Sequence, residues 1–271
     1  MKSACLWIMT WLYCLVASSA WGADSVLDKR ITVYGGVRLY QADGTFSSTK
    51  NGNPTVGVGM DDLGLNKNES NAIGGLMVNL GKRWNLRFDY YGYHDDATKT
   101  SGKNFNFDDV AIPVNAVVDS SLDIDLYVLS VAYNIVHTDK ARFGLGAGVH
   151  GIDFDLKISG KISVGGGEVP LGDGQQDFLA PIPNIWLHGA YAFTDRIIFR
   201  YGGGWLSAGY DDYDGSLLLA NAALEYWPFK RVGFGVGYNY ITADIDYDPG
   251  HKKENYDIDL SGVAFYITLG F

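Results

Sequence analysis

Five charged residues stand within runs of the sequence that are otherwise apolar or small, and they are the first candidates for chemistry. They are Arg38, Arg87, Asp89, Arg200 and Glu225. Three guanidinium groups and two carboxylates can pair with each other, and they must do so if they are buried, because an unpaired buried ion is strongly destabilising. Paired charges inside a narrow pore can act as a structural plug. They can also form a constriction that selects the charge of a small solute.

Carboxylates gather near the ends of several of the same runs. The candidates for an acidic extracellular rim are Asp123, Asp125, Asp153, Asp155, Asp211, Asp212, Asp244 and Asp246. Such a rim can be a solvated surface that keeps loops soluble, or it can bind divalent cations, for which oxygen ligands are suited. The spacing of a calcium-binding EF-hand loop is absent, and no glycine run precedes a helix pattern that could hold a phosphate. The sequence therefore predicts no metal site and no cofactor.

Hydrophobic alternation predicts the elements that position these residues. In the last run, one face carries the apolar residues and the other carries glycine, alanine, threonine and tyrosine; the apolar set is Val263, Phe265, Ile267, Leu269 and Phe271. Alternation at a period of two indicates a β-strand with one apolar face. Runs of this kind span residues 31–39, 72–80, 84–90, 127–135, 143–149, 185–193, 197–205, 218–226, 232–240 and 263–271.

The connections between the runs differ in length. Short ones lie at 81–83, 137–140, 194–195 and 228–230, and long polar ones lie at 42–69, 96–120, 159–180 and 248–255. Short turns at one end and long loops at the other are typical of outer-membrane barrels. The sequence therefore predicts an all-β fold, a transmembrane antiparallel up-and-down β-barrel of about ten strands. Eight or twelve strands, with a further hairpin hidden or absent in the long connections, and a soluble β-sandwich are the alternatives.

A barrel of this kind directs its apolar faces to lipid and its polar faces to the lumen. The five charged residues are then expected inside. Aromatic residues near the strand ends are expected to form the interfacial girdles, and the candidates are Tyr34, Tyr40, Trp84, Tyr90, Tyr127, Tyr133, Tyr226, Trp227 and Tyr240. Near Gly151 the apolar residues change face, which a β-bulge or emergence from the membrane would explain. The apolar segment 61–65 could cover the barrel mouth or contact a partner.

The first residues have the pattern of a secretory signal peptide. Lys2 precedes an uncharged apolar run at 4–17, and small residues follow it. We predict that residues 1–22 are removed and that residues 23–271 form the outer-membrane barrel domain. Cys5 and Cys14 would leave with the signal, and the remaining chain would carry a net charge of −11 from 20 basic and 31 acidic residues. This charge makes nucleic acid a poor partner.

The signal peptide, the alternating strands and the final strand ending at Phe271 resemble small bacterial outer-membrane barrels of the OmpA-like and OmpW-like grouping. The resemblance implies a place in the Gram-negative outer membrane, with membrane lipid and lipopolysaccharide as partners. It also implies that Phe265, Ile267, Leu269 and Phe271 are the signal presented to the barrel assembly machinery. It identifies no subfamily, and we expect a monomer.

Several non-enzymatic functions fit this resemblance, and the sequence does not choose among them. The barrel could be a narrow channel selective for small solutes, an envelope-structural barrel, or a surface adhesion protein that acts through extracellular loops. A barrel of this size is mostly filled by side chains, and porins with open channels use about 16–18 strands. General diffusion is therefore not expected.

Outer-membrane enzymes supply a further hypothesis, since omptin-like proteases and some lipid-modifying enzymes are also barrels. His94, followed by Asp95 and Asp96, and His150, with Asp153 nearby, offer groups for acid–base catalysis. The sequence has no Asp-His dipeptide and no Ser-His arrangement of matching context. We therefore predict that the protein is not an enzyme.

Overall fold

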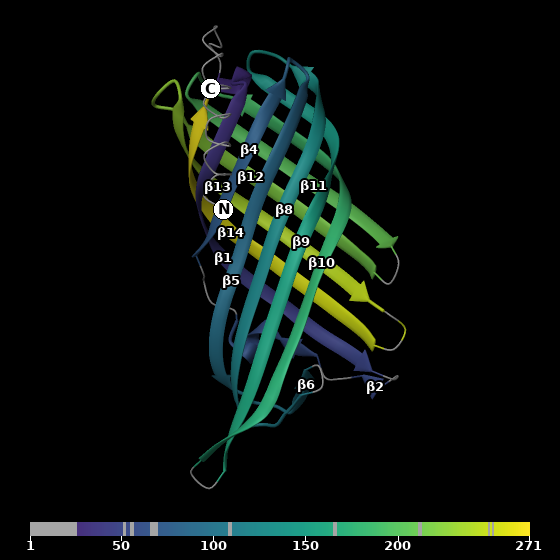
Figure 1. Cartoon of the computed structure of the whole chain (residues 1–271). Helices are drawn as coiled ribbons and strands as arrows, with labels where there is room; N and C mark the ends of the chain where they lie inside the picture. The colour runs from purple at the N-terminus through teal and green to yellow at the C-terminus, as the bar shows by residue number, and fades with distance from the viewer. Residues whose placement is uncertain are drawn as a thin grey trace, which may run out of the picture.

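The computed structural model of the chain shows long strands that wrap into one slender barrel (Figure 1). It describes residues 26–50, 53–54, 57–65, 70–107, 110–164, 167–210, 213–248, 250 and 252–271. The predicted signal peptide at 1–22 lies outside the described residues, as do Asp211 and Asp212. Nothing in the structure therefore bears on them.

The barrel is a closed antiparallel ring. Its strands are β1 (Ile31–Lys50), β4 (Ser70–Leu80), β5 (Trp84–Thr100), β8 (Val117–His137), β9 (Ala141–Val164), β10 (Gly167–Ala192), β11 (Ile197–Tyr210), β12 (Tyr213–Tyr226), β13 (Val232–Tyr247) and β14 (Lys252–Gly270). Each strand pairs with the next in this order, and β14 closes the ring on β1 with Phe265 opposite Val37. The predicted all-β, up-and-down barrel of about ten strands is confirmed.

Small elements lie outside the ring. Two short strands pair with β1: β2 (Asn53–Pro54) and β3 (Val58–Gly59). A separate hairpin joins β6 (Phe105–Phe107) to β7 (Val110–Ile112), so the 96–120 connection does hide a hairpin, but not one that enters the barrel. The helical elements are η1 (Val26–Asp28) and α2 (Met60–Leu63). No helix in the described ranges is long and apolar enough to cross a membrane.

The strands are much longer than the alternating runs predict. The 159–180 connection was expected to be a loop, yet β9 continues to Val164 and β10 begins at Gly167. The hairpin of β9 and β10 projects beyond the other strands at the end of the barrel opposite the C-terminus (Figure 1). The prediction of a long loop there is wrong. It relied on apolar residues on the outer face of each strand, and the outer face is polar in this part of the hairpin.

Strand β8 shows how the pattern changes along its length. Near the short turns its outward residues are exposed and apolar or aromatic, namely Tyr127, Leu129, Val131, Tyr133 and Ile135, and its inward residues include Ser130 and Asn134. Farther along, the outward residues are Asp119, Ser121, Asp123 and Asp125, and the inward ones are Leu122, Ile124 and Leu126. We call the first part of the barrel the membrane zone and the second part the outer extension.

The same inversion explains the change of face near Gly151 in β9. Inward positions carry Gly144 and His150 in the membrane zone and then Ile152, Phe154 and Leu156 in the outer extension. The pairing of β9 with β8 and with β10 runs in register through Gly151, without a bulge at that point. A bulge therefore does not explain the change of face, and the inverted faces are those expected of a strand that emerges from the membrane.

The aromatic girdles are formed by only some of the predicted residues. Trp84, Tyr127, Tyr133, Tyr226 and Tyr240 are exposed on the outer face, and Tyr90 is partly exposed there. Tyr34, Tyr40 and Trp227 were wrongly assigned to the girdles. Tyr34 and Tyr40 share the inward parity of Arg38 on β1, and Tyr40 and Trp227 are each only 1% exposed.

Candidate functional site

The first ion pair in the lumen is local to β5. Arg87 and Asp89 stand two residues apart on the inward face, and Arg87 Nε lies 2.6 Å from Asp89 Oδ2. The Tyr34 hydroxyl donates to the other carboxylate oxygen at 2.8 Å. Asp89 is fully buried. Both of its oxygens are thus satisfied, which is what a buried carboxylate needs.

The second ion pair joins neighbouring strands. Arg200 on β11 places Nε 2.9 Å from Glu225 Oε2 on β12. Glu225 is 3% exposed and also accepts from Trp227 Nε1 at 2.9 Å and from the Tyr266 hydroxyl at 3.2 Å. The tyrosine and tryptophan partners were not anticipated. Both residues follow the inward positions in the alternation of their strands, next to glycine-rich strands, and this pattern could have predicted them.

Arg38 lies in the same layer but has a different environment. Its guanidinium carbon stands 4.5 Å from the Tyr40 ring centroid and 4.7 Å from that of Tyr91. With the Asn239 amide oxygen turned towards it, Nη2 donates to that oxygen at 2.7 Å. Its Nε and Nη1 have no hydrogen-bond partner among the described residues. We call Arg38, the two ion pairs and their hydrogen-bond partners the central charge layer.

Aromatic rings fill the lumen beside this layer. A Cβ added at Gly235 would lie 2.2 Å from Cζ of Tyr266, and one added at Gly204 would lie 2.7 Å from the Trp186 ring. Gly204 and Gly235 therefore receive large side chains from neighbouring strands, whereas the nearest neighbours of Gly237 are Ala222 and Ala223.

An apolar layer lies beyond the charges, in the outer extension. It is lined by Tyr40, Tyr91, Tyr93, Ile124, Leu126, Ile152, Phe154, Leu217, Ile241, Ala243, Ile245, Ile258 and Leu260. The cavity left among them is about 30 Å³. This is about the volume that one water molecule takes in the liquid, and the surface that the three tyrosine rings and the aliphatic side chains present to it is almost wholly apolar. We expect this layer to be dry.

A lid covers the outer end of the apolar layer. It is formed by residues 57–65, whose Met60, Leu63 and Leu65 are fully buried. The Tyr93 hydroxyl inside the barrel donates to the Leu65 carbonyl at 2.9 Å. The segment thus folds back over the barrel mouth, the first of the two alternatives for its apolar sequence.

Polar contacts hold the lid at its edge. Lys103 Nζ lies 2.7 Å from Asp62 Oδ2, and the Gly59 amide donates to the same carboxylate at 2.9 Å. Partial burial alone would raise the pKa of Asp62, but the hydrogen bonds from Lys103 and Gly59 lower it overall. The carboxylate therefore stays charged and paired at neutral pH.

A vestibule opens on the other side of the charge layer, among the short turns. It has a volume of about 490 Å³ and is lined by polar side chains that include Asn79, Lys82, Asn85, Arg87, His188 and Arg200. The N-terminal turn η1 lies beside it. Arg142 pairs with Asp28 of this turn, and Leu27 packs among Ala190, Ile198 and Trp227.

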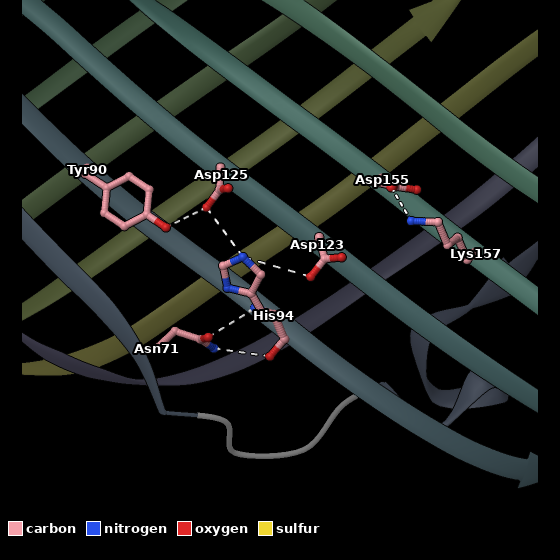
Figure 2. Close-up of polar contacts among 7 residues, drawn as sticks. All are labelled: Asn71, Tyr90, His94, Asp123, Asp125, Asp155 and Lys157. Atoms are coloured by element: carbon pink, nitrogen blue, oxygen red, sulfur yellow. Dashed lines mark hydrogen bonds and ion pairs between the residues drawn. The ribbon is translucent and has the colours of Figure 1, made fainter. Parts of the chain in front are cut away.

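The predicted acidic rim lies on the outer wall of the outer extension. Figure 2 shows one part of it, where His94 Nε2 lies 3.5 Å from Asp125 Oδ1 and 3.9 Å from Asp123 Oδ1. The Tyr90 hydroxyl donates to Asp125 at 2.7 Å, and Lys157 pairs with Asp155 (Figure 2). Exposed Asp153 stands opposite Asp125 in the sheet. These carboxylates do not surround the mouth; they face outwards beyond the aromatic girdle.

A second acidic part of the wall lies on β13 and β14. Asp244 is opposite Asp257, and Asn255 donates to both Asp244 and Asp246 at 3.2 and 3.0 Å. Partial burial and the nearby carboxylates of Asp259, Asp244 and Asp43 raise the pKa of Asp257. Like charges therefore repel one another on this face.

The residues considered for catalysis or metal binding are not brought together. His94 points outwards, whereas His150 is fully buried on the inward face of β9, where Asn184 is its hydrogen-bond partner at 3.0 Å. Across the described part of the chain, no group of three or more His, Cys, Asp or Glu side chains could hold a metal ion. Among the described residues, neither His94 nor His150 pairs with a carboxylate inside a cleft.

The proposed assembly signal faces outwards at the closing seam. Phe265, Ile267 and Leu269 are 50%, 51% and 39% exposed, and Arg231 stacks over the Phe271 ring at 5.9 Å. Recognition of these residues by the assembly machinery stays a prediction.

Comparison with known proteins supports the fold. No protein-family model matches the chain, and no curated protein matches its sequence. Among solved structures, the chain is similar to the outer membrane protease OmpT from Escherichia coli, with a TM-score of 0.57 and 11% identity over 90% of this chain and 97% of that one.

Two further similarities are weaker. The outer membrane protein OprG from Pseudomonas aeruginosa has a TM-score of 0.39 and 10% identity, with 89% of this chain and 96% of that one covered. The toluene transporter TodX from P. putida has a TM-score of 0.37 and 10% identity, with 90% of each chain covered. The chain has the architecture of small bacterial outer-membrane β-barrels.

Proposed function

We propose that this protein is a non-conducting barrel of the Gram-negative outer membrane, exported by a cleaved signal peptide at residues 1–22. It serves as an envelope-structural and surface-interaction protein and acts through its outer extension and loops. The observation that carries this proposal is the apolar layer, among whose lining side chains lies a cavity of about 30 Å³.

Conduction would require water or solute to cross this layer. The layer lies between the central charge layer and the fully buried lid residues Met60, Leu63 and Leu65. An ion that enters a dry apolar layer loses its hydration without gaining partners, which is strongly unfavourable. The charge layer therefore acts as a structural plug in this proposal and not as a selectivity filter.

The outer wall fits a solvated surface exposed outside the membrane. Its outward residues are aspartates, serines and lysines on strands whose inner faces are packed with aliphatic side chains. This is the pattern of a soluble β-structure, in which burial inside offsets the cost of ordering the chain. The wall and the β9–β10 hairpin are the surfaces available to lipopolysaccharide headgroups or to partners outside the cell.

We propose no catalytic role. The His94 cluster lies on an open wall, and the enclosed cavities of the described structure contain no histidine paired with a carboxylate. A general acid–base site needs such a pair within reach of a bound substrate.

Planar-bilayer recording tests the proposal. Purified wild-type protein, shown to be folded by its heat-modifiable migration, is expected to give no single-channel events. Arg200→Ala and Glu225→Ala variants are also expected to give none, because the apolar layer remains. Discrete current steps in the wild type that change with either variant would show that the charge layer gates a channel.

A further inference from the structure

The central charge layer is rich in donors and poor in acceptors. Each of its three guanidinium groups carries about five N–H donors, whereas its two carboxylates already accept the hydrogen bonds described above. The layer contains three arginines, Arg38, Arg87 and Arg200, and two carboxylates, Asp89 and Glu225. This composition gives a formal excess of one positive charge. A buried excess charge favours a counter-ion.

A cavity of about 80 Å³ lies within this layer. Four buried polar atoms on its wall have no hydrogen-bond partner in the described part of the chain: Arg200 Nη2, Asn221 Nδ2, Thr32 Oγ1 and Thr268 Oγ1. The guanidinium and amide nitrogens can only donate, and the hydroxyls can turn their protons into the cavity. All four can therefore point donors at one occupant.

We propose that this cavity binds a small monovalent inorganic anion of the size of chloride, held between Arg200 Nη2 and Asn221 Nδ2. Such an ion supplies the missing acceptor and offsets the excess charge of the layer, which stems from Arg38 outside the cavity lining; Asp89 and Glu225, each paired with an arginine, also line the cavity. Since one water molecule takes about 30 Å³, the cavity admits a chloride-sized ion with a water molecule but excludes a nucleotide or sugar phosphate. Water alone would satisfy the four atoms and leave the charge in place.

The anion reaches the site from the vestibule. Arg87 and Arg200 line both the cavity and the vestibule, and Lys82 adds a positive charge along the approach, where Arg142 is paired with Asp28 and Asp139 also lies. The two shared guanidinium groups connect the vestibule with the cavity. The apolar layer blocks the opposite side, so loading occurs from the end with the short turns. The site does not depend on the proposed surface function.

Bromide soaking identifies the occupant directly. A crystal of the mature protein grown in sodium bromide is expected to show an anomalous difference peak within hydrogen-bond distance of both Arg200 Nη2 and Asn221 Nδ2. Density for water at this position without an anomalous peak would overturn the proposal.

Thermal unfolding in detergent gives an independent readout. We expect the wild-type midpoint to rise with sodium chloride concentration relative to sodium gluconate at equal ionic strength, because an ion that binds only the folded state stabilises it. Asn221→Asp supplies an internal negative charge and is expected to lose this chloride-specific rise. Asn221→Leu, which removes the donor without adding charge, is expected to weaken it.

The matched control is Asn184→Asp. Asn184 is also buried and inward-facing, but it contacts His150 and does not line the cavity. This variant is expected to keep the chloride-specific rise. Equal midpoints of the wild type in chloride and gluconate, or a chloride-specific rise retained by both Asn221 variants, would contradict the proposal.

Discussion

The membrane zone and the outer extension are built from the same strands with opposite faces buried. In the membrane zone of β8, Leu129 and Val131 face outwards and Asn134 faces inwards; in the outer extension, Asp123 and Asp125 face outwards and Ile124 and Leu126 face inwards. The register does not change between them. The backbone thus continues as one sheet while the solvent around it changes from lipid to water.

This difference assigns a separate task to each region. Lipid surrounds the membrane zone, so its polar and charged side chains gather in the lumen, where they must pair. In the proposed function, water surrounds the outer extension, so its interior is an ordinary apolar core that closes the lumen. The proposed seal is a consequence of extending the barrel beyond the membrane and requires no separate plug domain.

Introducing a charge into the inner face tests the comparison most strongly. Leu126→Asp places a carboxylate in the apolar layer, and we expect it to lower the free energy of unfolding by more than about 4 kcal/mol or to prevent folding, because no partner is available. Asn134→Asp, on the same face of β8 but in the polar vestibule, is expected to change it by less than about 1 kcal/mol. Urea unfolding in detergent measures both. Equal effects would show that the two interiors do not differ.

Removing a carboxylate contrasts the lumen with the outer wall. Glu225→Ala leaves Arg200 buried without its partner, and we expect a loss of about 3–5 kcal/mol. Asp125→Ala removes an outward carboxylate from the extension, and we expect a change between about 0 and 1 kcal/mol. The same unfolding assay separates them. A small effect at Glu225 would mean that Arg200 is solvated or otherwise paired.

Weakening the lid tests whether it belongs to the core of the extension. Leu63→Ala removes fully buried apolar volume, and we expect a loss of about 2–3 kcal/mol in the local stability of the lid. The readout is the rate at which a protease cuts within residues 57–65 of the folded barrel. Val114→Ala, at an exposed position, is the control, and the protease is expected to cut this variant at the wild-type rate. Indistinguishable rates for both variants would remove the lid from the account.

The smallest effect concerns repulsion on the acidic wall. Partial burial and neighbouring carboxylates raise the pKa of Asp257 above its ordinary value of 3.8, so its charged form destabilises the folded state. The cost is present at neutral pH and disappears as the pH falls through the raised value towards 3.8. We expect Asp257→Asn to raise the unfolding midpoint slightly at pH 7 and to leave it unchanged below pH 3.8. A lowered midpoint at pH 7 would show net attraction.

Much of this architecture follows from the sequence, but from a rule that holds for only one of the two regions. The outward apolar face of residues 263–271 predicted the closing strand, and the short turns predicted the order of the ring. The same rule treated 159–180 as a loop and Tyr40 as a girdle residue, because it assumes lipid outside along the whole strand. Applied with inverted faces, Ile152, Phe154 and Leu156 would have predicted the extension.

The lumen was harder to predict than the wall. Parity alone placed the five charged residues on the inward face, but it could not pair them, since Arg200 meets Glu225 along a diagonal of the sheet and not directly opposite it. The partners Tyr34, Tyr266 and Trp227 depend on side-chain length and ring orientation. Such contacts are fixed by packing in three dimensions and leave no periodic signal.

The most direct test of the sealed lumen is the rate at which a small water-soluble thiol reagent labels single cysteines along β8, in a mature chain predicted to have no cysteine of its own. We predict rapid labelling of His137→Cys in the vestibule and of Asp125→Cys on the outer wall, and no labelling of Leu126→Cys or Ile124→Cys while the barrel is folded. Labelling of Leu126→Cys and Ile124→Cys at the rate of His137→Cys would reveal a continuous water path and contradict the account.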